Sequence, residues 1–269
     1  MDARFHFCSI LCDSVPLPVD FGRTFRYAGN PMQDIQTNSV PLSVRDCGIL
    51  PYADALALQL ELCADRQADA IDNTVLIVEH PAVITLGARK TENKLKTDES
   101  AILASGVEIV PVGRGGGTTA HNPGQLVFYP VIKLRSLGLG VNEYVRGLEA
   151  VGIDLLASFG VQSERRKGFP GLWVGEKKIA SIGVQIKKWV TFHGMAINLN
   201  NDLTLFDHII PCGLDGVQMT SAQNELNRPV DMPQARSRLA GLCAARWTTR
   251  EPGDQTVSSS APQSPPRSA

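Results

Sequence analysis

Two residues in the second half of the chain could carry out chemistry together. Lys178 begins a run of alternating residues, and Cys212 lies in a Pro-Cys-Gly sequence typical of a turn. A cysteine is a useful nucleophile only as its thiolate, which a nearby lysine can stabilise. At an ordinary pKa of about 8.5, only about 3% of a thiol is ionised at pH 7. The pair therefore predicts nucleophilic catalysis through Cys212, with Lys178 raising its thiolate fraction.

The element that positions Lys178 has the pattern of a β-strand. Alternate residues from Lys178 to Ile186 are apolar after the lysine itself, which puts the ammonium at the rim of an apolar face. Desolvation there favours the neutral lysine. A neutral Lys178 could also accept a proton from an attacking amine, and the two groups would then titrate as a pair.

A second alternating run, Val190 to Leu199, follows so soon that a tight antiparallel hairpin is expected. With a two-residue loop at Lys188-Trp189, Lys187 pairs with Val190, and Gly183 faces Gly194. The opposed glycines indicate either a close backbone crossing or a slot for a ligand. We expect the slot, and we expect Gly194→Val to fold while filling it.

A glycine-rich loop, residues 113–125, is the other stretch with chemical potential. Its glycines let backbone N–H groups approach a ligand, and Arg114 and His121 supply a cation and a titratable ring. No Gly-Lys-Ser/Thr follows, so the loop is not a nucleotide-binding P-loop, and no helix starts there as a dinucleotide site requires. Backbone N–H groups near Gly213 or in residues 115–117 could stabilise an oxyanion.

Composition limits the class of protein. The chain has 269 residues, of which 43% are hydrophobic and 20% charged, which fits one sizeable domain with tails or two small domains. A net charge of −1 argues against nucleic acid or an anionic membrane as partner. No apolar run is long enough for a membrane helix. Six scattered cysteines suggest neither a disulfide framework nor a zinc site. We therefore expect reduced thiols and a cytoplasmic protein, without cofactor or metal.

Periodicity predicts three helices and several strands. The helices span residues 51–68, 141–159 and about 233–247. In the first helix, the apolar stripe consists of Leu56, Leu60 and Cys63. The strands span residues 74–79, 82–86, 107–112 and 126–134, besides the hairpin, and Pro130 suggests an edge strand or a bulge. Strands grouped around helices indicate an α+β, or mixed α/β, domain. We expect a flexible extension at 1–40, a catalytic domain at 41–248 and a disordered tail at 249–269.

Several motifs in one order point to a family. They are Val78-Glu-His-Pro-Ala-Val-Ile-Thr-Leu-Gly87, Arg114-Gly-Gly-Gly through Pro123-Gly-Gln125, Lys178-Ile-Ala-Ser-Ile-Gly183, His193-Gly-Met-Ala-Ile-Asn198 and Ile210-Pro-Cys-Gly213. With them, the chain resembles the octanoyltransferases of lipoate biosynthesis, or lipoyl(octanoyl) transferases, in the superfamily of lipoate and biotin protein ligases. The family usually has Tyr and Gly on either side of the loop histidine, where this chain has Ala120 and Asn122.

The resemblance implies a single biotin/lipoate-ligase-like catalytic domain, with a mixed and antiparallel sheet flanked by helices. It implies an acyl-thioester on Cys212, whose pKa Lys178 lowers. Implied substrate contacts are Arg114, Gly115, Gly116, Gly117, Thr118, Thr119, Ala120, His121, Ser181, Ile182, Gly183, Gly194, Met195 and Ala196.

The implied reaction moves an octanoyl or lipoyl group between proteins. The donor is octanoyl-acyl carrier protein. The acceptors are lysines of lipoyl domains, in the E2 subunits of 2-oxoacid dehydrogenases and in the glycine cleavage H protein. No ATP or metal is implied, and the enzyme is expected to be a monomer.

Two other functions are alternatives. An ATP-dependent lipoate or biotin protein ligase would need no cysteine nucleophile, so the Ile210–Gly213 turn argues against it. A non-catalytic acyl-carrier-binding module would need neither Lys178 nor Cys212. Among the histidines, His80 and His208 are expected to be structural, whereas His121 and His193 either line the site or pack beside it.

Overall fold

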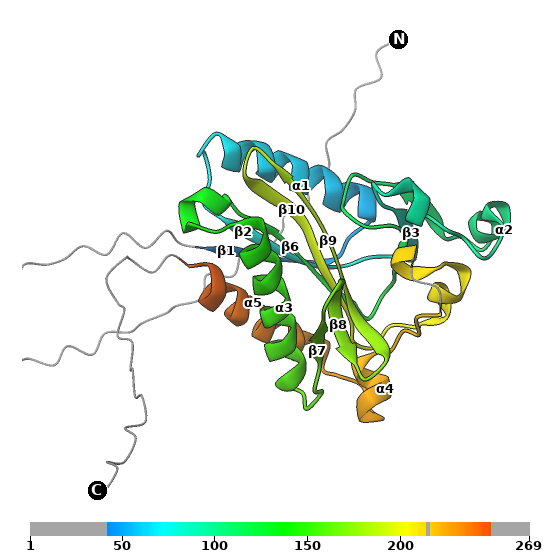
Figure 1. Ribbon diagram of the computed structural model, residues 1–269. Helices are drawn as coiled ribbons and strands as arrows, with labels where there is room; N and C mark the ends of the chain where they lie inside the picture. Colours follow the sequence, from blue (N-terminus) through cyan, green and yellow to red (C-terminus); the bar gives the residue numbers. More distant parts are fainter. Residues whose placement is uncertain (1–41, 214–215, 249–269) are drawn as a thin grey trace, which may run out of the picture.

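A mixed seven-stranded sheet forms the centre of the computed structural model (Figure 1). Its order is β1-β2-β6-β10-β9-β8-β7. The strands are β1 (Ser43–Ile49), β2 (Thr74–Glu79), β6 (Gln125–Val131), β7 (Glu164–Arg166), β8 (Phe169–Val174), β9 (Lys177–Lys187) and β10 (Val190–Asn198). Only β1 and β2 pair in parallel, and the other neighbours are antiparallel. This arrangement confirms the predicted mixed α/β class.

The structure describes residues 42–213 and 216–248, and of Cys212 only the backbone. The extension predicted at residues 1–40 and the tail predicted at 249–269 therefore lie outside the described residues.

Helices cover both faces of the sheet because β2 and its neighbours are apolar on both sides. On one face, α1 (Tyr52–Gln67) packs against Leu76, Val78 and Val127. On the other, α3 (Val141–Ala157) and α5 (Met232–Trp247) pack against Val75 and Ile77 (Figure 1). A continuous apolar run such as residues 74–79 is what a strand buried between two helical layers requires.

A smaller three-stranded sheet stands beside the main one. Its order is β4-β3-β5, from β4 (Glu108–Pro111), β3 (Val83–Leu86) and β5 (Thr119–His121). The remaining helices are α2 (Glu99–Ala104) and α4 (Ala222–Leu226), with short 3-10 turns η1 (Lys90–Glu92), η2 (Leu134–Leu137), η3 (Thr204–His208) and η4 (Pro211–Gly213). Ile84 and Ala120 pack with Leu205, Phe206 and Ile209 as a separate apolar cluster.

One prediction about these elements was wrong in detail, and one of the two alternatives for Pro130, the edge strand, is excluded. Leu60 is 48% exposed, because α1 instead buries a stripe that includes Ala55, Gln59 and Cys63. Pro130 lies in β6, which is an inner strand rather than an edge. Proline is accommodated there because β10 is irregular opposite it. His193 has a left-handed backbone, with φ of 57°, and its amide donates to Gln59 Oε1 at 2.7 Å.

The predicted hairpin register is confirmed. Lys187 pairs with Val190, and Gly183 faces Gly194. Lys188 and Trp189 both have positive φ, 50° and 66°, as the type I′ turn of a two-residue hairpin requires.

The predicted bare slot at the two glycines is wrong. A Cβ on Gly194 would lie 2.1 Å from the Phe128 carbonyl oxygen, and one on Gly183 would lie 2.8 Å from Arg114 Cδ. Backbone and side chain already fill these positions, so the glycines allow a close crossing.

We predict that Gly194→Ala destabilises the protein by more than about 3 kcal/mol, because the backbone of β6 must move to admit the methyl group. The matched control is Gly241→Ala, in α5, where a Cβ meets nothing within 4 Å. That variant should gain about 0.5–1 kcal/mol from helix propensity. Urea unfolding measures both, and equal midpoints for Gly194→Ala and the parent would contradict the close crossing.

Candidate active site

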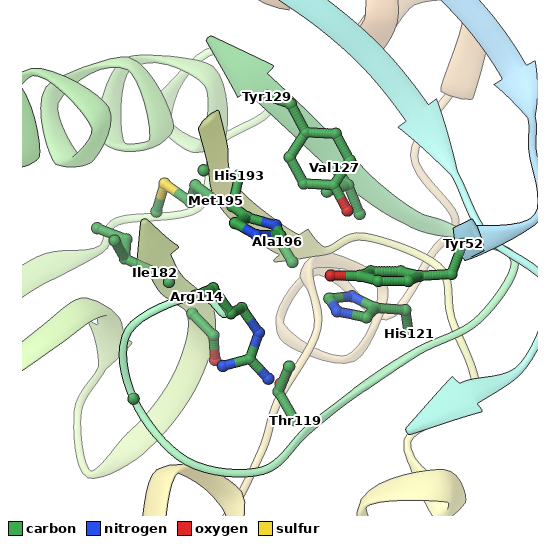
Figure 2. A pocket seen from close by; sticks show the side chains of 14 residues that line it. Tyr52, Arg114, Thr119, His121, Val127, Tyr129, Ile182, His193, Met195 and Ala196 are labelled. Carbon is green, nitrogen blue, oxygen red and sulfur yellow. The ribbon is translucent and has the colours of Figure 1, made fainter. Parts of the chain in front are cut away.

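Two connected hollows lie where the glycine-rich loop meets β9 and β10. The inner cavity is lined by Tyr52, Arg114, Gly116, Thr119, His121, Val127, Tyr129, Ser181, Ile182, Gly183, His193, Gly194, Met195 and Ala196 (Figure 2). The open groove is lined by Arg89, Glu92, Gly115, Gly116, Val145, Gly168, Phe169, Pro170, Lys178, Ile182, Gly183 and Val184. Gly116, Ile182 and Gly183 belong to both walls, so the groove leads directly to the cavity.

Lys178 is deeper than the strand pattern suggested. Only 2% of it is exposed, so it is buried in the floor of the open groove rather than placed at a rim. Its ammonium donates to the Pro170 carbonyl oxygen at 3.0 Å and lies 5.4 Å from the centroid of the Trp173 ring. Strand β8 supplies both contacts. It thereby holds the Lys178 ammonium at a position where water does not screen its charge.

The chain that follows Cys212 contacts residues of this groove. Gly213 packs so closely on Glu92 that a Cβ would lie 2.9 Å from Glu92 Cβ. After the undescribed residues 214–215, the chain runs beside the start of β9, where Lys178 N donates to Gln218 O at 2.8 Å. The fold thus brings the turn of Cys212 to the groove that contains Lys178.

Arg114 organises the glycine-rich loop. Its Nη1 donates to the carbonyl oxygens of Gly115 and Gly117, at 3.1 and 2.9 Å. Its Nη2 donates to the backbone and hydroxyl oxygens of Thr85, at 3.0 and 2.6 Å. The guanidinium therefore ties the loop to β3, while it also lines the inner cavity.

The loop glycines serve backbone packing as well. A Cβ on Gly117 would lie 2.4 Å from the Glu92 carbonyl oxygen, and one on Gly87 would lie 2.1 Å from Gly116 O. Glu92 is thus held between Gly117 of the loop and Gly213 of the Cys212 turn.

Aromatic and histidine rings form one side of the inner cavity. The Tyr52 and His121 rings stack with centroids 5.8 Å apart, and Figure 2 shows the Tyr52 hydroxyl directed between the His193 ring and Arg114. His80 lies behind them, where its two ring nitrogens contact Leu50 O and the Tyr129 hydroxyl, each at 2.7 Å. His121 and His193 line the cavity, whereas His80 has the structural contacts expected of it.

Burial keeps these imidazoles neutral. It lowers the pKa of His193 from 6.5 to about 4, with a smaller contribution from the positive charge of Arg114. Burial also lowers the pKa of His80 to about 4, and it holds the pKa of His121 well below the usual range. At pH 7 the cavity histidines are hydrogen-bonding groups without charge.

Most of the residues expected to contact substrate surround the two hollows. Those on the inner cavity are Arg114, Gly116, Thr119, His121, Ser181, Ile182, Gly183, Gly194, Met195 and Ala196. Gly115 lines the groove. Gly117, Thr118 and Ala120 line neither: Thr118 Oγ1 accepts from Lys94 N at 3.1 Å, and Ala120 is buried in β5.

Sequence reasoning missed Tyr52, Val127 and Tyr129 on the cavity wall. The period of two along β6 puts Val127 and Tyr129 on one face, so this pair could have been found. Tyr52 carried no such signal, because it is the first residue of α1.

The two departures from the family pattern are accommodated by specific contacts. Ala120 pairs with Ile84 and is fully buried. Asn122 donates to the Asp202 carbonyl oxygen at 2.8 Å and accepts from Asn201 Nδ2 at 3.2 Å. An amide thus anchors the loop at the position where the family has glycine.

The described part of the chain contains no cluster of three or more histidine, cysteine, aspartate or glutamate side chains that could hold a metal ion. Within those same residues, no helix has the length and apolar character needed to cross a membrane. Cys63 and Cys243 are buried free thiols.

We predict that the protein loses stability as the pH falls from about 6.5 towards 4. The unfolded histidines gain protons in this window while the buried ones do not. Each proton taken up on unfolding lowers the unfolding free energy by about 1.4 kcal/mol per pH unit. Urea unfolding at a series of pH values measures the slope, and a flat profile between pH 6.5 and 5 would contradict neutral burial of these rings.

Comparison with known proteins supplies an independent observation. The sequence profile of the lipoyl protein ligase A/B catalytic domain matches residues 51–242. An octanoyltransferase of Desulfovibrio desulfuricans is 44% identical over 193 residues, covering 71% of this chain and 81% of that protein. One of Syntrophotalea carbinolica is 42% identical over 198 residues, covering 74% and 90%.

A solved structure shares the fold at low identity. The bipartite lipoate protein ligase of Thermoplasma acidophilum superposes with a TM-score of 0.58 at 15% identity, covering 77% of this chain and 82% of that one. This likeness supports the architecture of the sheet and its helices.

Proposed function

We propose a function that is based on family membership, because the chain belongs to the octanoyltransferases within the lipoyl protein ligase A/B family. It is an acyltransferase that moves an octanoyl group in protein lipoylation. The observation that carries the assignment, beyond relatedness, is one open groove that contains buried Lys178 and has Glu92, the neighbour of Gly213 in the Cys212 turn, on its wall; the groove leads into the inner cavity.

The reaction proceeds in two half-reactions at Cys212. The Cys212 thiolate attacks the carbonyl carbon of the octanoyl donor thioester, the acyl–sulfur bond of the donor breaks, and the carrier sulfur leaves as a thiol with the proton that the Lys178 ammonium gives up. A lysine amine of the acceptor then attacks the new thioester, an amide forms, and the Cys212 thiolate is released. No ATP is consumed, since the donor is already activated.

Lys178 makes this nucleophile available at neutral pH. A buried ammonium beside the sulfur stabilises the thiolate over the thiol. In the second half-reaction, the neutral amine of Lys178 takes the proton that the acceptor lysine loses. The carbonyl of Pro170 orients the Lys178 ammonium, and the packing of β8 excludes water from it.

A backbone amide of the glycine loop holds the developing oxyanion. Of the alternatives, Gly115 N already donates to Val184 O, and Gly213 N donates to Ile210 O. We therefore assign the oxyanion to the amide of Gly116, because Gly116 faces both hollows.

The acyl chain runs from the open groove, of about 260 Å³, into the inner cavity, of about 30 Å³. The cavity walls include Val127, Ile182, Met195 and Ala196, which supply apolar surface for methylene groups. Each buried methylene contributes about 0.8 kcal/mol.

The partners follow from this chemistry. The donor is octanoyl-acyl carrier protein, and the acceptors are lipoyl domains of 2-oxoacid dehydrogenase E2 subunits and of the glycine cleavage H protein. The reaction takes place in the cytoplasm, and the enzyme acts as a monomer. An ATP-dependent ligase would share the fold but would have no use for the Lys178 and Cys212 arrangement.

We predict octanoyl transfer from the carrier protein to a lipoyl domain without ATP, and none from free octanoate with ATP. Cys212→Ser should lose nearly all transfer. Cys47→Ser, in β1 and away from both hollows, is the control and should keep it. Mass spectrometry of the lipoyl domain measures the product. Transfer from free octanoate that depends on ATP would establish a ligase instead.

We predict that Lys178→Met raises the pH at which iodoacetamide alkylates Cys212, because the thiolate loses its neighbouring cation. An increase of about one pH unit corresponds to about 1.4 kcal/mol. Lys177→Met is the matched control, since that side chain is 52% exposed and faces Glu225 at 3.9 Å. Identical alkylation profiles for the two variants would reject the role of Lys178.

A further inference from the structure

His193 is a buried polar side chain whose ring has no hydrogen-bond partner. It is 1% exposed, and neither ring nitrogen contacts a polar group among the described residues. Its backbone is left-handed, and the amide is held there by Gln59 Oε1 at 2.7 Å. A buried imidazole with two unused nitrogens on a sparsely populated backbone conformation marks a place where a ligand group can bind.

Two neighbouring groups on the cavity wall, Tyr129 and His121, have their hydrogens committed elsewhere. The Leu50 carbonyl can only accept, so His80 Nδ1 carries the proton, and His80 Nε2 accepts from the Tyr129 hydroxyl. The oxygen of Tyr129 can therefore only accept a further hydrogen bond.

His121 is fixed in the same way. Gln125 Nε2 donates to Asn198 Oδ1 and to Ala120 O, so Gln125 Oε1 accepts from His121 Nδ1. The other nitrogen of neutral His121 is an acceptor.

His193 is the buried wall residue whose two ring nitrogens both lack a hydrogen-bond partner, and its neutral ring offers one donor and one acceptor; the hydroxyls of Tyr52, Thr119 and Ser181 also line this wall. A hydroxyl group also donates one hydrogen and accepts another, so it matches this ring and its acceptor neighbours. A carboxylate matches less well, because both terminal nitrogens of Arg114 already donate to the loop and to Thr85.

We propose that the inner cavity binds medium-chain acyl groups that carry a hydroxyl at the far end, and that the His193 ring is its hydrogen-bond partner. The proposal rests on the proposed function, in which the acyl carbonyl lies in the open groove. The chain then passes Ile182 and Gly183, which are shared by groove and cavity, and ends at His193. With a plain octanoyl chain, water occupies the same position and contacts the same nitrogens.

The test compares two free acids of equal size, nonanoate and ω-hydroxyoctanoate, by titration calorimetry with the full chain. An apolar pocket would favour nonanoate by about ten-fold or more, since the buried hydroxyl would lose its water. Wild-type protein should instead bind the hydroxy acid about five-fold more tightly than nonanoate. This ratio is the gain in affinity expected from one net hydrogen bond. His193→Phe keeps a planar ring without nitrogens and should restore the preference for nonanoate.

His208→Phe is the matched control, because it makes the same substitution at a histidine that lines neither the cavity nor the groove, and it should preserve the preference for the hydroxy acid. A wild-type preference for nonanoate overturns the proposal whether or not His193→Phe folds, and so does binding of neither acid. These measurements need no turnover. Normal octanoyl transfer with a preference for nonanoate would therefore reject this inference alone, whereas absent transfer would reject the proposed function.

Discussion

The buried guanidinium of Arg114 is the interaction on which the site depends. It joins the glycine-rich loop to Thr85 of β3, and the amide of the adjacent Gly115 donates to Val184 of β9. The smaller sheet, the loop and the main sheet thus meet at one side chain. Gly183 has no Cβ because Arg114 Cδ occupies that position. Without this cation, the wall between the groove and the inner cavity would have no fixed shape.

The same charge shapes the electrostatics of the cavity. Burial is the main reason that His121 and His193 are neutral, and the positive field of Arg114 adds to it. A cavity lined by neutral rings and apolar side chains suits the uncharged acyl chain that we propose for it. The second cation, Lys178, lies apart in the open groove with Phe169 and Pro170, where we propose that the thioester chemistry takes place. The division between a neutral cavity and a charged groove follows the division of the substrate into an acyl tail and a thioester.

The sequence predicted the elements that depend on local pattern. The alternation of residues 178–186 and 190–199 and a two-residue loop were sufficient for the hairpin register, and the apolar stripe of residues 141–159 was sufficient for α3. The sequence did not predict where two backbone segments approach each other closely. Whether Gly194 opens a slot or admits the Phe128 carbonyl depends on β6, sixty-odd residues earlier in the chain. Pro130 in an inner strand, the depth of Lys178 beneath β8 and the position of Tyr52 depend on tertiary neighbours in the same way.

The central claim is that Cys212 carries the acyl group, and intact-protein mass spectrometry tests it most directly. Wild-type enzyme is mixed with octanoyl-acyl carrier protein, without ATP and without acceptor, and then digested to locate the modification. The account predicts one octanoyl group on the peptide that contains Cys212, labile to hydroxylamine and discharged when a lipoyl domain is added. An unmodified Cys212 under conditions in which the lipoyl domain still becomes octanoylated would contradict it.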